Sequence, residues 1–427
     1  MTHRGTFAGF CAVGALLVGV GGAPARADAV EDFYKNARMS MYIGYTAGGG
    51  YDRYARLLAR HMERHIPGKP NIVPRQYTGA GGLRVANSIF NVFPQDGTAI
   101  GAFGRQSPLE ALTGNKKAKF VGNEFNWIGS ANREYSVCAF WHTSPIKTTD
   151  DLFKKGPIVG GNGAGSGTDI QAMMLNNLIG TKLTLITGFP GGVDINLAME
   201  RGEVHGRCAW SWSSVVATQA DWVKDKKIVF PLQIAAKAHP DLKDVPLVGK
   251  FIKNDRDRQI LDVVLAPLTI GRPYAVGPRV PTERVEALRA AFDANMKDEK
   301  FRAEAEKGRL PIDPADGKEV QALMDKLYAL PPDIIKGAGD AISHTNNIEI
   351  SQARIPVTTV MGNISKVQRE GRSVSWSGEG KKGKLSVGGK TKVMVAGKAA
   401  KRGMLKAGME CSFKVRGAQQ ALAIDCK

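Results

Sequence analysis

Apolar runs and amphipathic segments alternate along the first half of the chain. The apolar runs are short and uninterrupted, as in buried strands, whereas Tyr54, Leu57, Leu58 and Met62 recur at helical spacing in the segment that follows the first run. The pattern predicts strands at 39–45, 71–77 and 99–103 and helices at 51–65 and 83–93. Because strands that alternate with helices form βαβ units, we expect a sheet with parallel strands.

The same order of elements recurs further along, although no residue-level repeat accompanies it. The predicted strands are 157–161, 182–187 and 205–210, and the predicted helices are 168–179 and 193–201. Further strands are predicted at 226–234 and 263–275, and amphipathic helices at 281–307 and 318–330, which we expect to return to the first lobe. The prediction is a pair of α/β lobes with mixed sheets and a cleft between them.

Beyond residue 356 the pattern changes to short strand candidates separated by glycines. They cover 357–368, 373–377, 384–387, 392–395, 411–415 and 421–425. Such a series is typical of a small all-β barrel. The predicted division of the chain is 28–140 for the first part of lobe 1, 141–225 for lobe 2, 226–342 for the return to lobe 1, 343–356 for a linker and 357–427 for the barrel.

The N-terminus has the composition of a secretory signal peptide. His3 and Arg4 precede an apolar stretch at 7–22, and Ala25-Arg26-Ala27 provides a small-x-small cleavage site. The apolar stretch is too short and too rich in glycine for a membrane span of about 20 residues. We therefore expect residues 1–27 to be removed and the exported protein to begin at Asp28, in the periplasm.

The positive charge of the chain is unevenly distributed. The chain has 59 Lys and Arg against 40 Asp and Glu, a formal net charge of +19, and after residue 350 it has 16 basic and 4 acidic residues. Nucleic-acid platforms interleave basic residues with aromatic side chains that stack on bases, but this segment contains only Trp376 and Phe413. We therefore expect no nucleic-acid partner and favour contact with anionic envelope surfaces, or simple solubility.

Removing the signal peptide leaves four cysteines, an even number that permits disulfides in an exported protein. If 411–416 and 421–426 form a hairpin, Cys411 and Cys426 lie directly opposite each other, and we predict a bridge between them. Cys138 and Cys208 also allow a bridge, but only their even number supports it.

Glycine-rich loops follow strands and precede helices in both predicted lobes. They cover 48–50 and 79–82 in the first lobe and 162–167 and 188–192 in the second. Ligands of open α/β sheets bind beyond the carboxyl ends of the strands, where helix N-termini present unpaired N–H groups and partial positive charge. Since glycine lets the backbone approach a ligand closely, these loops predict an anion site that needs no basic side chain.

Other candidate chemistries fit the residues less well. The loop at 162–169 (NGAGSGTD) lacks the Gly-Lys-Ser/Thr ending of a nucleotide phosphate loop. His61 and His65 lie four apart on one predicted helix without a third metal ligand. Ser166 and Ser213 lack the Gly-x-Ser-x-Gly pattern of a hydrolase nucleophile. We expect no cofactor, no metal and no catalysis.

Several motifs in chain order resemble one known family. Tyr45–Arg56 (YTAGGGYDRYAR), Tyr77–Gly82 (YTGAGG) and Pro94–Thr98 (PQDGT) are similar to motifs of the extracytoplasmic solute receptors of tripartite tricarboxylate transporters, also called Bug-type binding proteins. Further matches, among them Gly188–Gly192 (GFPGG) and Arg272–Pro278 (RPYAVGP), extend the resemblance over about residues 39 to 335. It implies a two-lobed, flytrap-like periplasmic-binding-protein fold that captures a small organic carboxylate for membrane permease subunits.

The resemblance also implies that the first two glycine loops hold a ligand carboxylate through backbone N–H groups and bridging waters, while the second lobe selects the rest of the ligand. We expect the receptor to be a monomer. The predicted ligand-binding residues are Ala47, Gly48, Gly49, Gly50, Asp52, Thr78, Gly79, Ala80, Gly81, Gly82, Asn162, Gly163, Gly165, Ser166, Thr168, Asp169, Phe189 and Gly191.

Two features depart from the family pattern. Many members have a His after the glycine loop of the second lobe, where this chain has Thr168-Asp169, and an acid there argues against a tricarboxylate ligand. The all-β segment from Val357 is not part of the usual receptor. Two alternatives therefore remain open, a ligand sensor for a signalling partner and, in a different class, an envelope-interaction protein dominated by the C-terminal segment.

Overall fold

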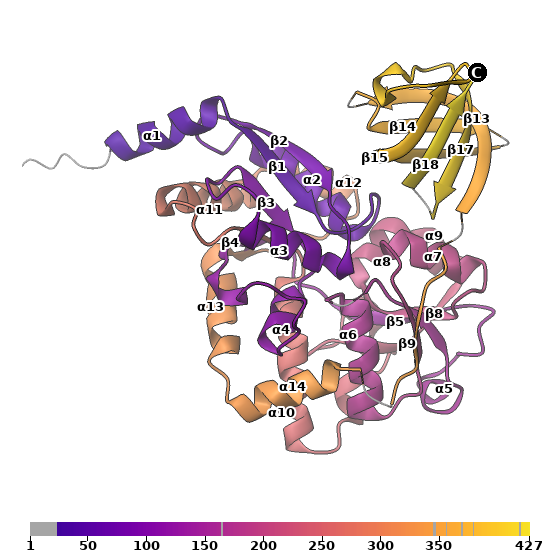
Figure 1. The fold of residues 1–427 in the computed structure, drawn as a ribbon. Coiled ribbons are helices and arrows are strands. Elements are labelled where there is room, and N and C mark those ends of the chain that lie inside the picture. Colours follow the sequence, from indigo (N-terminus) through magenta and orange to yellow (C-terminus); the bar gives the residue numbers. More distant parts are fainter. Residues whose placement is uncertain are drawn as a thin grey trace, which may run out of the picture.

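The computed structural model describes residues 24–163, 165–344, 347–355, 357–368, 370–378, 380–417 and 420–427. The predicted signal peptide lies outside these ranges except for its last four residues, which open helix α1 (Pro24–Lys35). Figure 1 shows two α/β lobes and a separate strand-rich unit at the C-terminal end. No helix within these ranges is long and apolar enough to cross a membrane.

Lobe 1 is built on a six-stranded mixed sheet with the order β11-β4-β10-β3-β1-β2. Strands β1 (Arg38–Ile43), β2 (Asn71–Gln76) and β3 (Ala99–Ala102) are parallel, and the antiparallel pairings involve β4 (Asn126–Ser130), β10 (Pro273–Val276) and β11 (Ala315–Asp316). Its helices are α2 (Gly50–Met62), α3 (Leu83–Asn91), α4 (Ser107–Leu112), α11 (Thr282–Lys297), α12 (Glu299–Lys307) and α13 (Gly317–Tyr328). The apolar face predicted for α2 is buried.

Lobe 2 contains a second six-stranded mixed sheet, with the order β12-β7-β6-β8-β5-β9. Strands β6 (Ile158–Gly160), β7 (Thr184–Thr187), β8 (Gly206–Ser211) and β12 (Ile350–Gln352) are parallel, and β5 (Ser136–Trp141) and β9 (Ile228–Ile234) form an antiparallel edge. The helices are α5 (Thr149–Lys154), α6 (Gly167–Met174), α7 (Gly192–Glu200), α8 (Trp212–Thr218) and α9 (Ala220–Lys224). The predicted pair of lobes with mixed sheets is confirmed.

Several predicted elements are corrected by the structure. The run 263–275 is not one strand but the end of helix α10 (Asp255–Leu265), a 3-10 turn, and then β10. The predicted helix 281–307 is two helices, because the Asp298 carboxylate accepts a hydrogen bond from the Phe301 N–H at 2.9 Å and so caps the start of α12. Helix α14 (Pro332–Ile342) forms where no element was predicted.

Lobe 2 also extends beyond its predicted boundaries. Strand β5 begins at Ser136, inside the range predicted for lobe 1, because it pairs with β8 and β9. Strand β9 therefore belongs to lobe 2, and the return to lobe 1 begins after it rather than at residue 226. The predicted linker contributes β12, which adds a parallel strand beside β7. The chain thus leaves lobe 2 for the C-terminal unit directly from its sheet.

The two lobes are packed against each other. One continuous cluster of buried apolar side chains includes Leu83 and Phe103 of lobe 1 together with Ile170 and Leu185 of lobe 2. Because this apolar surface is buried between the lobes, the structure represents a closed arrangement of the cleft.

The C-terminal unit is a closed barrel, as the strand pattern predicted. Its strands are β13 (Val357–Gln368), β14 (Ser373–Gly378), β15 (Lys381–Val395), β16 (Lys398–Ala399), β17 (Glu410–Arg416) and β18 (Gln420–Cys426). The order β14-β13-β17-β18-β15 closes on itself through a further pairing of β14 with β15. Two predicted strands at 384–387 and 392–395 form the single long strand β15, whose register shift between Val387 and Lys392 is typical of a bulge that bends a strand around a barrel.

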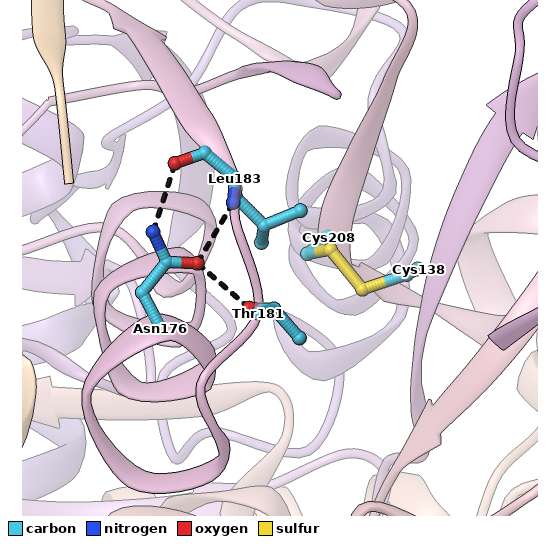
Figure 2. Close-up of a disulfide and its surroundings, with 5 residues drawn as sticks. All are labelled: Cys138, Asn176, Thr181, Leu183 and Cys208. Atoms are coloured by element: carbon cyan, nitrogen blue, oxygen red, sulfur yellow. Dashed lines mark hydrogen bonds between the residues drawn. A yellow bond between two sulfur atoms is a disulfide. The ribbon is translucent and has the colours of Figure 1, made fainter. Parts of the chain in front are cut away.

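Two disulfides are present in the structure. Cys411 and Cys426 are opposite partners in the β17–β18 hairpin and are bonded to each other. Cys138 of β5 is bonded to Cys208 of β8 in the core of lobe 2. Figure 2 shows this second bridge near the end of α6, where Asn176 accepts a hydrogen bond from the Leu183 N–H at 2.9 Å and so anchors the helix end to the start of β7.

We expect protein exported to an oxidising compartment to have no free thiol among these four cysteines. Alkylation under denaturing, non-reducing conditions, followed by peptide mass mapping, should leave all four unlabelled. Reduction before alkylation should label all four, which controls for access of the reagent. Labelling of Cys411 and Cys426 without reduction would contradict the barrel bridge.

Candidate functional site

A cavity lies between the two lobes, and three helices begin at its wall. Gly50 opens α2 of lobe 1, and Gly167 and Gly192 open α6 and α7 of lobe 2. The first N–H groups of a helix have no partner within the helix, and they mark its positive end. Three such ends around one cavity create a strongly anion-attracting environment.

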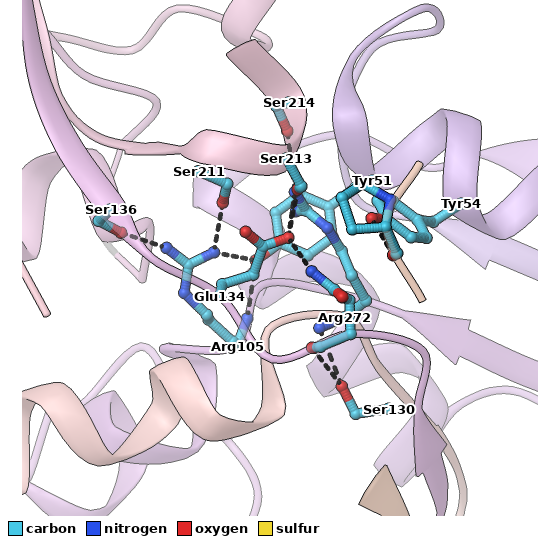
Figure 3. Close-up of polar contacts among 12 residues, drawn as sticks. Tyr51, Tyr54, Arg105, Ser130, Glu134, Ser136, Ser211, Ser213, Ser214 and Arg272 are labelled. Carbon is cyan, nitrogen blue, oxygen red and sulfur yellow. Dashed lines mark hydrogen bonds and ion pairs between the residues drawn. The ribbon is translucent and has the colours of Figure 1, made fainter. Parts of the chain in front are cut away.

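Three buried arginines line the same cavity, and two of them are drawn in Figure 3. Arg105 follows β3 of lobe 1 and is 3% exposed. Its guanidinium donates to the Ser136 hydroxyl at 2.8 Å and to the Ser211 hydroxyl at 3.0 Å, both in lobe 2. Its Nε is buried without a hydrogen-bond partner. Arg105 therefore bridges the lobes through neutral hydroxyls while its charge stays uncompensated by them.

Arg207 is the second arginine and lies on β8 in lobe 2, 6% exposed. Its guanidinium donates to the Gly192 carbonyl at 3.0 Å and to the Asn196 side-chain oxygen at 3.1 Å, and it stacks over the Trp210 ring at 4.7 Å. Burial lowers the pKa of Arg207 to about 9. Among the residues that the structure describes, no carboxylate forms an ion pair with Arg207 or Arg105.

Arg272 differs because it has a carboxylate partner. It lies just before β10 and forms an ion pair at 2.9 Å with Glu134, and both side chains are 1% exposed. Its guanidinium also donates to the hydroxyls of Ser213 and Ser214 at 2.8 Å each. Burial alone would lower the pKa of Arg272, but the Glu134 carboxylate raises it above its usual value. The pair is neutral overall, so the surplus positive charge of the cavity belongs to Arg105 and Arg207.

The predicted ligand residues are divided between two cavities. Gly49, Gly50, Asn162 and Thr168 line the arginine cavity. A second cavity, of about 760 Å³, is lined by Thr78, Gly79, Ala80, Gly81, Asn162, Gly163, Asp169 and Phe189. Ala47, Gly48, Asp52, Gly82, Gly165, Ser166 and Gly191 line neither of them. The two glycine loops of lobe 1 thus do not face one common crevice in this closed arrangement.

Two predicted acidic residues stabilise loops rather than facing the arginine cavity. Asp52 accepts from the Gly48 N–H at 2.8 Å and pairs with Arg56 at 2.7 Å, which fixes the first glycine loop. Asp169 accepts from the Gly163 N–H at 3.1 Å and from the Ser166 hydroxyl at 2.9 Å. Burial raises the pKa of Asp169. Its carboxylate is therefore occupied by the loop of its own lobe.

The glycine loops of the two lobes also contact each other. A side chain at Gly81, which has a φ of +62°, would place its Cβ 2.6 Å from the Ser166 nitrogen and 2.7 Å from the Gly163 carbonyl oxygen of lobe 2. The Tyr45 hydroxyl donates to the Gly81 carbonyl at 2.7 Å and holds the loop in place. Gly81 is thus required for the lobes to close.

Replacing Gly81 with valine should weaken ligand binding at least tenfold, whichever carboxylate is used, because the closed arrangement would be blocked. Calorimetry would measure the affinity. Gly202→Val is the matched control, since Gly202 also has a positive φ, of +72°, but has open space around it. Equal losses in both variants would indicate backbone strain alone.

Sequence reasoning missed the three arginines of the cavity. Arg105 follows β3 by three residues, and so lies at the carboxyl end of a strand, where ligands of such sheets bind. Arg207 interrupts an otherwise buried strand, which is unusual for a charged residue. Arg272 belongs to a stretch that was matched to the family but was given no role. These signals were present, but only the folded chain shows that the three side chains meet.

The two histidines considered above as metal ligands have carboxylate partners. His61 of α2 contacts Glu304 of α12 at 2.6 Å, and His65, just beyond the end of α2, contacts Asp298, the capping residue of α12, at 3.1 Å. Among the described residues, no group of His, Cys, Asp and Glu is arranged to hold a metal ion. Trp210 and Trp212 are buried in the core of lobe 2, and Trp210 also lines the arginine cavity.

Two mixed sheets with a cavity between the lobes define the two-lobed fold of periplasmic binding proteins. No protein-family model and no curated protein sequence matches the chain. Among solved structures, the periplasmic binding protein BugD matches with a TM-score of 0.58 and 17% identity, covering 74% of this chain and 99% of that one.

Two further solved structures contain a bound acid. R. palustris Rpa4515 with adipate matches with a TM-score of 0.54 and 15% identity, covering 71% of this chain and 97% of that one. MatC from Rhodopseudomonas palustris with bound malate matches with a TM-score of 0.53 and 16% identity, covering 70% and 98%. At these identities the similarity establishes the fold.

Proposed function

We propose that this protein is an extracytoplasmic solute receptor of the tripartite tricarboxylate transporter type, which binds a small dicarboxylate between its lobes and delivers it to membrane permease subunits. The observation that carries the proposal is the pair of buried guanidinium groups, Arg105 and Arg207, at a cavity where three helices begin. A buried cation is costly unless it is paired. An anionic ligand would supply the missing partners.

The charge of the site favours two carboxylates over one. Arg105 and Arg207 come from different lobes and use separate neutral partners, so a ligand with two carboxylates could engage both and hold the lobes together. The space available to the centre of a water-sized sphere is about 70 Å³, which corresponds to a few water molecules and favours a short acid. The solved neighbours with bound adipate and malate support this class of ligand.

The sequence motifs agree with this proposal. The glycine loops at 48–50 and 79–82, which resemble those of the receptor family, lie at the junction of the lobes. The expected signal peptide places such a receptor in the periplasm, and N-terminal sequencing of the periplasmic form should give Asp28 as its first residue. Catalysis is not part of the proposal.

Native mass spectrometry of protein purified without denaturation would show whether a small acid is retained, and its mass would identify it. Calorimetry with acetate, succinate, malate, adipate and citrate would then rank the ligands. We expect at least one dicarboxylate to bind with micromolar or better affinity, and acetate to bind at least a hundredfold more weakly. Failure of every carboxylate to bind would overturn the proposal. If citrate bound more tightly than every dicarboxylate, the assigned ligand class would be a tricarboxylate instead.

A further inference from the structure

The barrel carries a polar face on its outer surface. On β13, β14 and β15, the side chains that point away from the buried core align in three rows across the strands. We call these nine residues the serine–lysine face: Asn363, Ser377 and Lys382; Lys366, Ser375 and Lys384; Gln368, Ser373 and Ser386. Alternate residues of the same strands, such as Val374 and Trp376, point inward and are buried.

The charge of this face is entirely positive. Its three lysines are exposed, and its other six residues are four serines, an asparagine and a glutamine. Of the acids of the barrel that the structure describes, Glu410 at the start of β17 pairs with Asn363 at the border of the face, Glu370 lies in the turn after β13, and Asp425 lies on β18. The nine residues of the face therefore include three lysines and no acid, and Glu410 lies beside the row that contains Asn363.

We propose that the serine–lysine face binds a linear polyanionic glycan, a polysaccharide with acidic groups on successive sugars. This site is separate from the solute cavity and is independent of the receptor function proposed above. It would hold the receptor at an acidic polysaccharide of its surroundings while the two lobes capture solute.

The spacing of the lysines favours an extended polymer over a small anion. Neighbouring strands lie about 4.8 Å apart, so Lys366 and Lys384, separated by β14, are about 10 Å apart. Lys382 and Lys384 are two residues apart on one strand, or about 7 Å. An exposed ion pair contributes only about 0–1 kcal/mol. One small anion would thus bind weakly, whereas a polymer can engage all three lysines at once.

The neutral residues of the face favour a glycan over other polyanions. Serine, asparagine and glutamine donate and accept hydrogen bonds and match the hydroxyl groups of sugars. Single-stranded nucleic acids are usually held by aromatic stacking, but Trp376 and Phe413, the aromatic residues of the barrel, are buried. Membrane surfaces are bound most firmly when apolar side chains insert, and the serine–lysine face has none.

The test compares two variants of the full chain that lose the same charge. In the face variant, Lys366, Lys382 and Lys384 are all replaced by serine. In the control variant, Lys398, Lys401 and Lys406 are replaced by serine; these lysines are also exposed but lie outside the face. Thermal unfolding and an intact Cys411–Cys426 bridge would verify that the barrel is folded in both.

Binding would be measured by biolayer interferometry on immobilised polygalacturonate and dextran sulfate, with neutral dextran as the blank. We expect wild-type protein to bind both acidic polymers, the face variant to bind at least tenfold more weakly, and the control variant to stay within about twofold of the wild type. Equal losses of affinity in the two variants would show that binding depends only on net charge, and would overturn the proposed site. Tighter binding to a single-stranded DNA or to phosphatidylglycerol vesicles would overturn the glycan assignment, as would wild-type protein that binds neither polysaccharide.

Discussion

Replacing Arg207 with methionine is expected to weaken dicarboxylate binding at least a hundredfold and, at the same time, to raise the unfolding temperature of the unliganded protein. A carboxylate bound to an arginine gains about 1.5–3 kcal/mol for each charge-assisted hydrogen bond, so losing two such bonds costs about 3–6 kcal/mol, more than the roughly 2.7 kcal/mol of a hundredfold change. The affinity falls because the ligand carboxylate loses the Arg207 guanidinium as its hydrogen-bond donor.

The gain in stability follows from the pKa of Arg207. Burial lowers this pKa to about 9, so at every pH below that value the folded protein keeps a cation that would be better solvated in the unfolded chain. Methionine has a similar length and is apolar, and it removes this cost at the expense of the hydrogen bonds to Gly192 and Asn196. We expect a net gain of about 1–2 kcal/mol.

Calorimetry and differential scanning fluorimetry on the same preparations would test both effects. Arg84→Met is a matched control, because Arg84 is exposed over the Tyr77 ring beside a glycine loop and does not line the arginine cavity. It should change neither quantity appreciably. If Arg207→Met loses both stability and affinity, Arg207 has a structural role. If the variant binds the ligand normally, Arg207 does not belong to the binding site.

Much of the fold could be predicted because its signals are local. The helical spacing around Tyr54 and the glycines that punctuate the strands each act over a few residues, and they give the order of elements in both lobes. The hairpin that pairs Cys411 with Cys426 follows from two short strands around one turn. One of the wrongly predicted elements is a short apolar run that is compatible with either a strand or a helix.

The segment 263–275 shows that ambiguity. Val263, Val264 and Leu265 are apolar and β-branched or bulky, which favours a strand, but they form the last turn of a helix that begins ten residues earlier. The start of that helix is marked by Asn254, whose side chain accepts a hydrogen bond from the Asp257 N–H at 2.8 Å. The cap and the apolar run belong to one element, and neither identifies it alone.

The arginine cavity could not be predicted in the same way, because its parts come from distant regions of the chain. Arg105, Arg207 and Arg272 are brought together by three strands of two sheets and by closure of the lobes. The glycine loops pointed to the junction between the lobes where this cavity lies, since helix N-termini at strand ends are local features. The expectation that backbone groups alone provide the positive charge was incomplete. Contacts between the lobes, such as that of Arg105 with Ser136, join residues that are distant in the sequence, so no single segment indicates them.

Replacing Arg272 with methionine should have the opposite effect on stability to the Arg207 substitution, although both residues line the same cavity. Glu134 is 1% exposed and would be left without its cation. Removing one partner of a buried ion pair typically costs about 3–5 kcal/mol, whereas removing both is far less costly. For a protein of this size we expect the unfolding temperature to fall by about 4–6 °C.

The double variant Glu134→Gln/Arg272→Met distinguishes this explanation from a general loss of packing. Because glutamine is neutral, the double variant should be more stable than Arg272→Met alone, and the double-mutant cycle should give a coupling energy of more than about 1 kcal/mol. Thermal and urea unfolding without ligand would measure it. Strictly additive losses would contradict the ion pair. Strong coupling, together with a stabilised Arg207→Met, would show that the protein neutralises one arginine of the cavity with its own carboxylate and keeps another buried without one.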